Sequence, residues 1–146
     1  MEGMKLKGSA ELINKKAKFR CTVEEKQDII TDYTPPLGDG EGHTSLELLL
    51  LSLSSCFASS VKFLLMREKI KVDELKVNAE GERREEHPTG FKNISLFIII
   101  KAEGLKSDIL EKVIRLSEEN ICPVYSMIKG NTLIDVKYSI VNAEGK

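Results

Sequence analysis

Three cysteines, Cys21, Cys56 and Cys122, have the most versatile chemistry in this 146-residue chain. We expect the chain to be cytoplasmic, because its first residues carry no apolar run of the kind found in signal peptides. An odd number of cysteines in a reducing compartment argues against a framework of structural disulfides. Each cysteine is therefore a core residue, a metal ligand or a reactive thiol.

Cys56 lies in a long apolar run, and small hydroxylated residues surround it at helical spacing. Positions three and four residues away share a helix face, and around Cys56 these include Ser52, Ser59 and Ser60. Small side chains allow another backbone to approach closely, or leave room for a substrate. A cysteine inside an apolar helix is more often a core residue, so both interpretations stay open.

Cys122 directly precedes Pro123, after a segment with helical periodicity that ends near Asn120. If Pro123 occupies the first position of a new helical turn, Cys122 is the N-cap of that turn. The N–H groups at a helix N-terminus favour a thiolate, so this position predicts a lowered thiol pKa. Such a thiol suits either an attacking or a resolving role. Cys21, in a predicted strand, is expected to be a core residue.

Metal binding needs several ligands at suitable spacing. The candidate ligands are Cys21, His43, Cys56, His87 and Cys122. No pair of them has the close C-x-x-C or H-x-x-x-H spacing of zinc sites. The sequence also lacks a P-loop, a dinucleotide-binding fingerprint and a G-x-S-x-G nucleophile turn. We therefore expect neither a metal nor an organic cofactor.

Composition and charge indicate one soluble globular domain over residues 1–146. Apolar residues make up 41% of the chain and charged residues 31%, with a formal net charge of -1. Because acidic and basic residues are interleaved, we expect no nucleic-acid partner. The apolar run over residues 46–66 approaches the length of a membrane span, roughly 20 residues. Glu47, Lys62 and five serines interrupt it, so we expect a buried helix and no membrane partner.

Three strands are predicted in the first third of the chain, where β-branched residues lie between turn residues. They span residues 6–13, 18–25 and 27–33. A turn-rich segment follows over residues 35–42. Thr44 and Glu47 then have the spacing of a capping box, which predicts a helix from this point to about Lys69. Because leucines occur on nearly every face, this helix is expected to be buried all round.

The second half of the chain predicts a strand pair, a helix and a closing strand. The elements are strands over residues 75–85, 91–103 and 133–140, a helix from an N-cap at Ser107 to about Asn120, and a further helical turn over residues 124–129. The run from Ile98 to Ile100 is typical of a strand covered on both faces. The resulting order is β-β-β-α-β-β-α-β, an α+β fold with a long buried central helix packed on an antiparallel sheet.

Several segments resemble the OsmC/Ohr family, the osmotically inducible and organic hydroperoxide resistance proteins. Residues 45–56 are similar to the P-x-E-L-L-L…C segment of OsmC-like proteins, and residues 118–124 are similar to their second cysteine motif. Residues 81–86 and 91–94 resemble one branch of that family. The predicted order of elements agrees too, so the resemblance covers nearly the whole chain.

The resemblance implies an intertwined homodimer with central long helices and active sites at the subunit interface. It implies reduction of organic hydroperoxides or hydrogen peroxide, with Cys56 as the peroxidatic thiol and Cys122 as the resolving one. Cys56 would be oxidised to a sulfenic acid, which then condenses with Cys122 to a disulfide. A lipoyl protein or a thioredoxin-type dithiol would reduce the pair again.

Two charged residues are candidates for activating the thiol, and both depart from the family pattern. Peroxidase members carry an acidic residue ten positions before the first cysteine, where this chain has Leu46; its acid, Glu47, is nine before. Nine residues of helix place Glu47 on the opposite face from Cys56, so only the partner subunit's Glu47 could reach that thiol. Family members also use an arginine from an N-terminal strand, and Arg20 is the only arginine in that region. Ser45 replaces a common proline.

Two other functions stay open on the sequence. The apolar interface of such a dimer could hold a small hydrophobic or acyl ligand, with the cysteines as packing residues. Alternatively, the chain is a redox sensor in which a Cys56–Cys122 disulfide changes the shape of the dimer. The distance between the two sulfurs is the most informative single observation.

Overall fold

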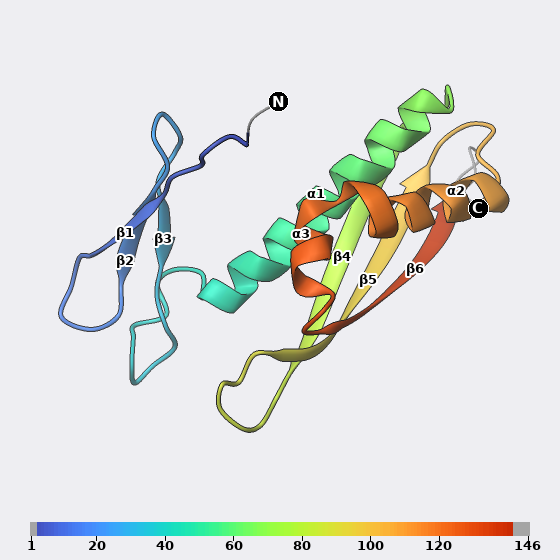
Figure 1. Cartoon of the computed structure of the whole chain (residues 1–146). Coiled ribbons are helices and arrows are strands. Elements are labelled where there is room, and N and C mark those ends of the chain that lie inside the picture. Colours follow the sequence, from blue (N-terminus) through green and yellow to red (C-terminus); the bar gives the residue numbers. More distant parts are fainter. Residues whose placement is uncertain (1–2, 142–146) are drawn as a thin grey trace. The chain divides into compact units, whose positions relative to one another are not determined.

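The computed structural model describes residues 3–141 and divides the chain into two compact units, Met1–Leu48 and Leu49–Lys146. Among the described residues each unit holds one three-stranded sheet (Figure 1). In chain order the elements are β1 (Ser9–Leu12), β2 (Phe19–Thr22), β3 (Ile29–Thr31), α1 (Ser45–Arg67), β4 (Glu74–Arg83), β5 (Phe91–Lys101), α2 (Ser107–Leu116), η1 (Ser117–Ile121), α3 (Pro123–Ile128) and β6 (Leu133–Val141). The predicted α+β order is confirmed, and the single domain over residues 1–146 stays a prediction.

The three N-terminal strands form an antiparallel sheet in the order β1-β2-β3. All three are shorter than predicted, because polar turns end them early. The Asn14 side chain accepts hydrogen bonds from the backbone N–H groups of Lys16 and Lys18, at 2.9 and 3.1 Å, within the first hairpin. Glu25, with a φ of 64°, adopts the left-handed conformation in the second.

A polar loop follows β3 and is organised around the carboxylate of Asp32, which is 2% exposed. This carboxylate accepts the backbone N–H groups of Tyr33, Asp39 and Glu41 at 2.7, 3.2 and 3.1 Å. Burial by itself raises the pKa of Asp32, but the three N–H donors outweigh it and hold that pKa below its ordinary value. Only glycine fits at Gly38, because a Cβ there would overlap the backbone of Tyr33.

Helix α1 begins at the capping box, as predicted. The Thr44 hydroxyl oxygen accepts the backbone N–H of Glu47 at 3.2 Å, and the Glu47 carboxylate accepts that of Thr44 at 2.8 Å. The helix ends two residues before the predicted Lys69. Lys69 has a φ of 63°, a left-handed conformation that cannot continue the helix.

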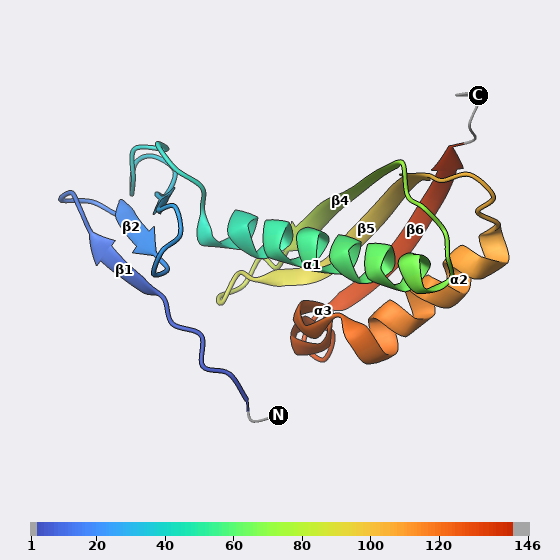
Figure 2. The ribbon, with the colours of Figure 1, turned by 90° about the horizontal axis from the view of Figure 1, so that it is seen from above.

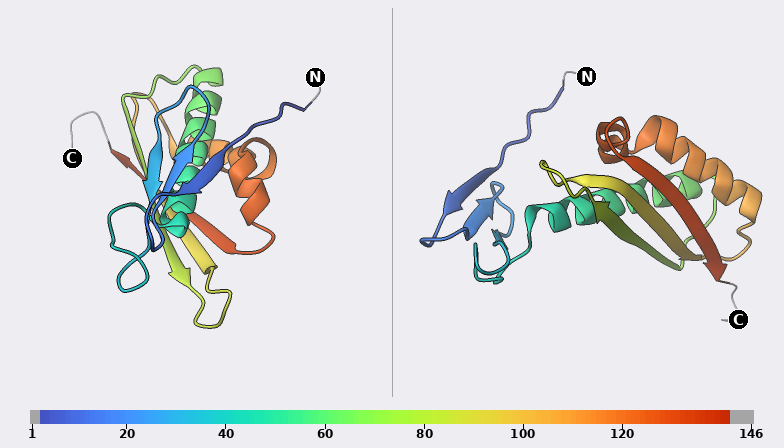
Figure 3. Two further views of the ribbon diagram at one scale, coloured as in Figure 1. Left: turned by 90° about the vertical axis from the view of Figure 1, so that its left-hand side faces the viewer. Right: turned by 90° about the horizontal axis from the view of Figure 1, so that it is seen from below.

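The second sheet has the strand order β4-β5-β6 within the described residues. β4 and β5 form the predicted antiparallel pair, whereas β5 and β6 are parallel. A parallel pair needs a crossover, which the segment α2–η1–α3 supplies. Only the pairing of β6 therefore differs from the expected antiparallel sheet. Figures 2 and 3 show α1, α2 and α3 on the same face of this sheet.

The apolar core lies between this sheet and the helices. Its fully buried side chains include Leu53, Phe57, Val61 and Leu65 of α1, Ile94, Leu96, Ile98 and Ile100 of β5, and Leu110 and Val113 of α2. The opposite face of β5 is open in the single chain, where Phe97 is 39% exposed and Ile99 is half-buried. The prediction that β5 is covered on both faces is therefore wrong for the single chain.

Helix α1 is buried on one face only, so the prediction of burial all round is wrong for the single chain. Leu51, Phe63 and Met66 are 53%, 46% and 58% exposed. By length and composition α1 could also cross a membrane, but the core helices of globular proteins can have the same length and composition. Its packing against β5 is that of a core helix.

The crossover between β5 and β6 contains three helical pieces. α2 begins at Ser107, but its N-cap is Lys106, which has no capping side chain; the predicted N-cap is therefore one residue late. The helix then widens into the π-turn η1, close to its predicted end, and α3 confirms the predicted further turn. π-turns inside helices are frequent at functional sites, and this one leads directly into Cys122.

Candidate thiol site

The sulfurs of Cys56 and Cys122 lie 3.2 Å apart, and the Cys122 S–H donates to the Cys56 sulfur. Cys56 is in the middle of α1, and Cys122 is the residue between η1 and α3. A disulfide bond is about 2.05 Å long, so both residues are free thiols in nonbonded contact. The fold thus brings together two residues that are 66 positions apart in the sequence.

The backbone around Cys122 is that of a helix N-cap, as predicted. Cys122 is extended (φ -77°, ψ 107°), Pro123 starts the helix, and the Cys122 sulfur accepts the backbone N–H of Tyr125 at 3.4 Å. The Cys122 N–H donates to the carbonyl oxygen of Ser117 at 3.0 Å. The sulfur is therefore positioned from both sides, by η1 before it and by α3 after it.

The pKa of Cys122 is raised, whereas the sequence predicted that it is lowered. Burial raises the pKa of this thiol to about 11, and the neighbouring Cys56 raises it as well. The Tyr125 N–H acts in the predicted direction and lowers the pKa, but it does not offset the loss of hydration. The predicted thiolate is therefore wrong at neutral pH, where Cys122 keeps the proton that it donates to Cys56.

The two thiols differ in their access to solvent. Cys122 is 2% exposed, whereas Cys56 is half-buried. Of the serines predicted around Cys56, Ser52 and Ser59 are exposed and Ser60 is only 5% exposed. The Ser60 hydroxyl donates to the carbonyl oxygen of Cys56 at 3.1 Å. A reagent from solvent therefore reaches the Cys56 sulfur first.

Two residues beside the thiols were missed in the sequence. The Tyr125 hydroxyl donates to the Glu118 carboxylate at 3.5 Å, and the Tyr125 ring centre lies 5.8 Å from that of Phe57. Burial raises the pKa of Glu118 and the pKa of Tyr125, and the Glu118 charge raises that of Tyr125 further. Glu118 lies four residues before Cys122 and Tyr125 three after it. This helical spacing is the signal that could have identified them.

Glu47 and Arg20, the predicted activating residues, belong to the N-terminal unit and have partners there. The capping-box bonds to Thr44 hold the Glu47 carboxylate and lower its pKa. Arg20 forms loose ion pairs with Glu11, at 3.9 Å, and with Asp28, at 3.7 Å. Capping and surface pairing account for both residues without catalysis, and their roles at the thiol stay predictions.

Cys21 lies in β2 and is half-buried. Its sulfur is 3.8 Å from the hydroxyl oxygen of Thr31 on the neighbouring strand, and its strand partners are Ala10 and Ile29. This is the environment of a packing residue in a sheet.

A cluster of three carboxylates in the N-terminal unit has the composition of a cation site. One oxygen each of Asp32, Asp39 and Glu41 lies within 4.8 Å of the others. Lys16 pairs with Asp39 at 2.7 Å, and Lys18 pairs with Glu41. Together with the backbone N–H groups at Asp32, these lysines neutralise the cluster, so it needs no cation.

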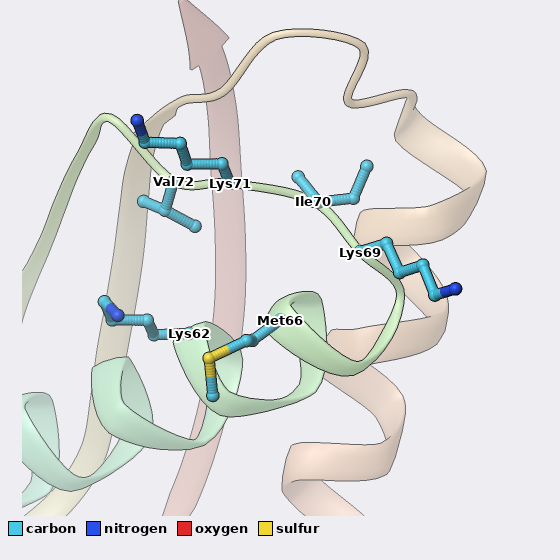
Figure 4. A pocket seen from close by; sticks show the side chains of 6 residues that line it. All are labelled: Lys62, Met66, Lys69, Ile70, Lys71 and Val72. Carbon is cyan, nitrogen blue, oxygen red and sulfur yellow. The ribbon is translucent and has the colours of Figure 1, made fainter.

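A pocket of about 400 Å³ lies at the C-terminal end of α1 (Figure 4). Its lining residues are Lys62, Met66, Lys69, Ile70, Lys71 and Val72, and neither cysteine is among them. Figure 4 shows that the three lysine side chains point in different directions. An anion is held by donors that converge on it, so we assign no ligand to this pocket.

Comparison with known proteins agrees with the fold. The family model of the OsmC-like protein matches residues 38–137. Protein YhfA of Escherichia coli (strain K12) is 31% identical over 98 residues, which cover 67% of this chain and 73% of YhfA. A hypothetical protein from Aquifex aeolicus VF5 has a similar structure, with a TM-score of 0.82 and 26% identity over 97% of this chain and 98% of that one. A Legionella pneumophila structure, described as an organic hydroperoxide resistance protein OsmC, has a TM-score of 0.76 and 18% identity over 95% and 99% of the two chains.

Proposed function

Because this chain belongs to the OsmC-like protein family, we propose that it is a thiol-dependent peroxidase in oxidative stress defence. Its substrates are organic hydroperoxides or hydrogen peroxide. The observation that carries this proposal is the 3.2 Å contact between the sulfurs of Cys56 and Cys122. The similar Legionella structure is named for organic hydroperoxide resistance, which supports the substrate class.

The difference in exposure supports Cys56 as the peroxidatic thiol and Cys122 as the resolving one. The Cys56 thiolate attacks a peroxide oxygen, the O–O bond breaks, and the alkoxide leaves and takes up a proton to become the alcohol; Cys56 becomes a sulfenic acid. The Cys122 thiolate then attacks the Cys56 sulfur, and the displaced hydroxide takes up a proton to become water. In total, two thiols and one hydroperoxide give a disulfide, an alcohol and water.

An external dithiol of the lipoyl or thioredoxin type completes the proposed cycle by reducing the disulfide. We propose that the protein acts in the cytoplasm as a homodimer. The exposed apolar side chains of α1, Leu51, Phe63 and Met66, support a dimer, because exposed apolar patches mark protein interfaces. Arg20 and Glu47 are proposed to activate Cys56 only within such a dimer.

Hydroperoxide consumption by the purified chain tests the proposal, with cumene hydroperoxide or hydrogen peroxide as substrate and dithiothreitol or dihydrolipoamide as reductant. We expect many turnovers per chain, which Cys56→Ser abolishes. Cys122→Ser should stop at the Cys56 sulfenic acid, detected by its mass after trapping with dimedone. Cys21→Ser is the matched control and should keep full turnover. Absence of turnover with every peroxide, or full turnover in Cys56→Ser, contradicts the proposal.

The raised pKa of Cys122, about 11, predicts a pH dependence of the resolving step. Below this pKa the thiolate fraction of Cys122 increases about tenfold for each pH unit. The rate of disulfide formation should therefore also increase about tenfold for each pH unit between about pH 7 and pH 10. Rapid mixing of the chain with one equivalent of peroxide, followed by acid quenching and mass analysis, measures the step. A rate that does not change with pH contradicts the protonated state of Cys122.

A redox sensor is the second candidate, because the same sulfur contact allows a stoichiometric Cys56–Cys122 disulfide without turnover. Glu47 is held by its capping bonds and Arg20 by its ion pairs within the N-terminal unit, and this favours the redox sensor over a catalyst. Rapid oxidation by one equivalent of peroxide, with no further consumption in excess dithiol, would support the sensor. A protein that only binds a small hydrophobic or acyl ligand, the third possibility, would have thiols that peroxide does not oxidise rapidly.

A further inference from the structure

Tyr125 belongs to the thiol site, but the proposed reaction gives its side chain no role. It lies in α3, a helix of only six residues in which no residue is fully buried. Helices this short are marginal in water, so they depend on contacts with the rest of the fold. Because Cys122 is the N-cap of α3, the contacts that hold this helix also place the Cys122 sulfur.

Two contacts of Tyr125 connect the two sides of the thiol pair. Its backbone N–H donates to the Cys122 sulfur at 3.4 Å. Its ring centre lies 5.8 Å from that of Phe57, with the ring planes tilted by 51°, and this separation is in the range of favourable aromatic pairs. Phe57 is 0% exposed and directly follows Cys56 in α1. One residue therefore joins the turn that carries one sulfur to the helix that carries the other.

The ring of Tyr125 makes the stronger contact, and the hydroxyl the weaker one. The hydroxyl donates to the Glu118 carboxylate at 3.5 Å, beyond the usual O–H···O range of about 2.5–3.0 Å. Val124 and Ile128 of α3 also pack against the core, but within the described site Tyr125 is the α3 residue that donates to the Cys122 sulfur. The ring pair is thus the contact that links the position of α3 most directly to the thiols.

We propose that Tyr125 is a positioning residue for the resolving step, because its ring on Phe57 holds the N-terminus of α3 with the Cys122 sulfur in place to attack. The proposal rests on the assignment of Cys122 as the resolving thiol. The sulfurs of the pair are 3.2 Å apart and a disulfide is about 2.05 Å long, so closure needs a movement of only about 1.2 Å. A misplacement of about 1 Å can slow a reaction greatly, so a small shift of α3 would matter.

An aromatic disulfide, 5,5′-dithiobis(2-nitrobenzoate), separates the two steps without any peroxide. In a Cys21→Ser background, the Cys56 thiolate displaces one thionitrobenzoate and forms a mixed disulfide with the other half of the reagent. The Cys122 thiolate then attacks the Cys56 sulfur and displaces the second thionitrobenzoate. Each protein thiol gives its proton to the buffer. The two releases appear as two phases of absorbance, of which only the second reports the resolving thiol.

We expect Tyr125→Leu to slow the second phase by roughly three- to tenfold, as loss of an aromatic pair predicts, and to change the first by less than about twofold. Tyr125→Phe keeps the ring, so it should restore the second phase. Tyr138→Leu is the matched control, because Tyr138 also packs against the core but its hydroxyl donates to Glu111 of α2 at 2.6 Å. Both phases should stay unchanged in this control.

Replacement of the other ring tests whether the pair itself matters. Phe57→Leu should slow the second phase as Tyr125→Leu does, and the double variant should be no slower than either single variant, because all three lack the same ring pair. Circular dichroism and the first phase show whether each variant is folded. If Phe57→Leu does not fold, the comparison of Tyr125→Leu with Tyr125→Phe decides the matter.

The proposal is overturned if the second phase is unchanged in Tyr125→Leu, if both phases slow equally, or if Tyr125→Phe is as slow as Tyr125→Leu. Independent, multiplying effects of the Phe57 and Tyr125 substitutions would also overturn it. Because the reagent contains no peroxide, a chain that consumes no hydroperoxide but shows the selective Tyr125 effect contradicts the peroxidase alone. A chain that turns over peroxide without the Tyr125 effect contradicts only the role of Tyr125.

Discussion

The N-terminal and C-terminal units of this protein are stabilised by different kinds of interaction. Every fully buried apolar side chain among the described residues belongs to the C-terminal unit. In the N-terminal unit the strands are exposed or half-buried, and the buried side chain at its centre is the carboxylate of Asp32. One unit is thus held by an apolar core, and the other by a hydrogen-bonded polar loop.

This difference indicates that the N-terminal unit needs another surface to cover it. Isolated sheets of such short strands are marginal in water, and Leu12, Val23 and Ile29 are 51%, 50% and 45% exposed. The C-terminal unit, in turn, has exposed apolar side chains on α1 and on the open face of β5. Apolar surface is therefore left uncovered on both units, and the proposed homodimer is the assembly that would cover it.

The largest effect is expected in the core of the C-terminal unit. Leu53→Ala removes a side chain that is 0% exposed, so the free energy of unfolding should fall by about 2–5 kcal/mol. Urea denaturation monitored by circular dichroism measures this loss. A loss smaller than about 1 kcal/mol would contradict the difference between the two units, because the C-terminal unit would then not depend on its apolar core.

A smaller and local effect is expected in the polar loop. Asp32→Asn removes the charged acceptor of three backbone N–H groups, and protection of the amides of Tyr33, Asp39 and Glu41 against hydrogen exchange should fall roughly tenfold. The folded-state pKa of Asp32 lies below the ordinary 3.8. The contribution of the charge to protection should therefore be complete above this ordinary value, and it should be lost as the pH falls through the lower folded-state pKa.

The Asn variant should lack this acid dependence altogether, and amides of the C-terminal core serve as the internal control. If protection of the loop is insensitive to both the substitution and the pH, the polar loop is not what holds the N-terminal unit together.

The smallest effect is expected for Leu12→Ala, the counterpart of Leu53→Ala in the other unit. Leu12 is 51% exposed, so at concentrations where sedimentation shows a monomer, the free energy of unfolding should change by less than about 0.5 kcal/mol. At concentrations where sedimentation shows a dimer, the loss should become larger. An equal effect at both concentrations would argue that no second copy covers this sheet.

Features that depend on residues close together in the sequence were predictable. The capping box of Thr44 and Glu47 and the cap at Cys122 before Pro123 both depend on residues within one helical turn, and both are present. The order of strands and helices was predictable for the same reason, since each follows from the pattern of its own segment.

Properties that depend on distant segments were not predictable from local patterns. The contact between Cys56 and Cys122 joins α1 to the end of η1, and it was expected only from the family resemblance. The pKa of Cys122 was predicted with the wrong sign, because the cap was visible in the sequence and the burial was not. Burial of α1 all round was also wrong, because composition does not show which face the sheet covers.

Whether the sulfurs of Cys56 and Cys122 can meet depends on the number of residues in η1, the π-turn that precedes Cys122. A π-turn holds one residue more than the corresponding α-turn. Deletion of one residue between Ser117 and Ile121 would restore α-helical geometry and rotate the following chain by ~100° about the helix axis. The Cys122 sulfur would then leave the Cys56 sulfur, although both cysteines would still be present. Related sequences with two cysteines can therefore be sorted by the length of this segment, and not by the cysteines alone.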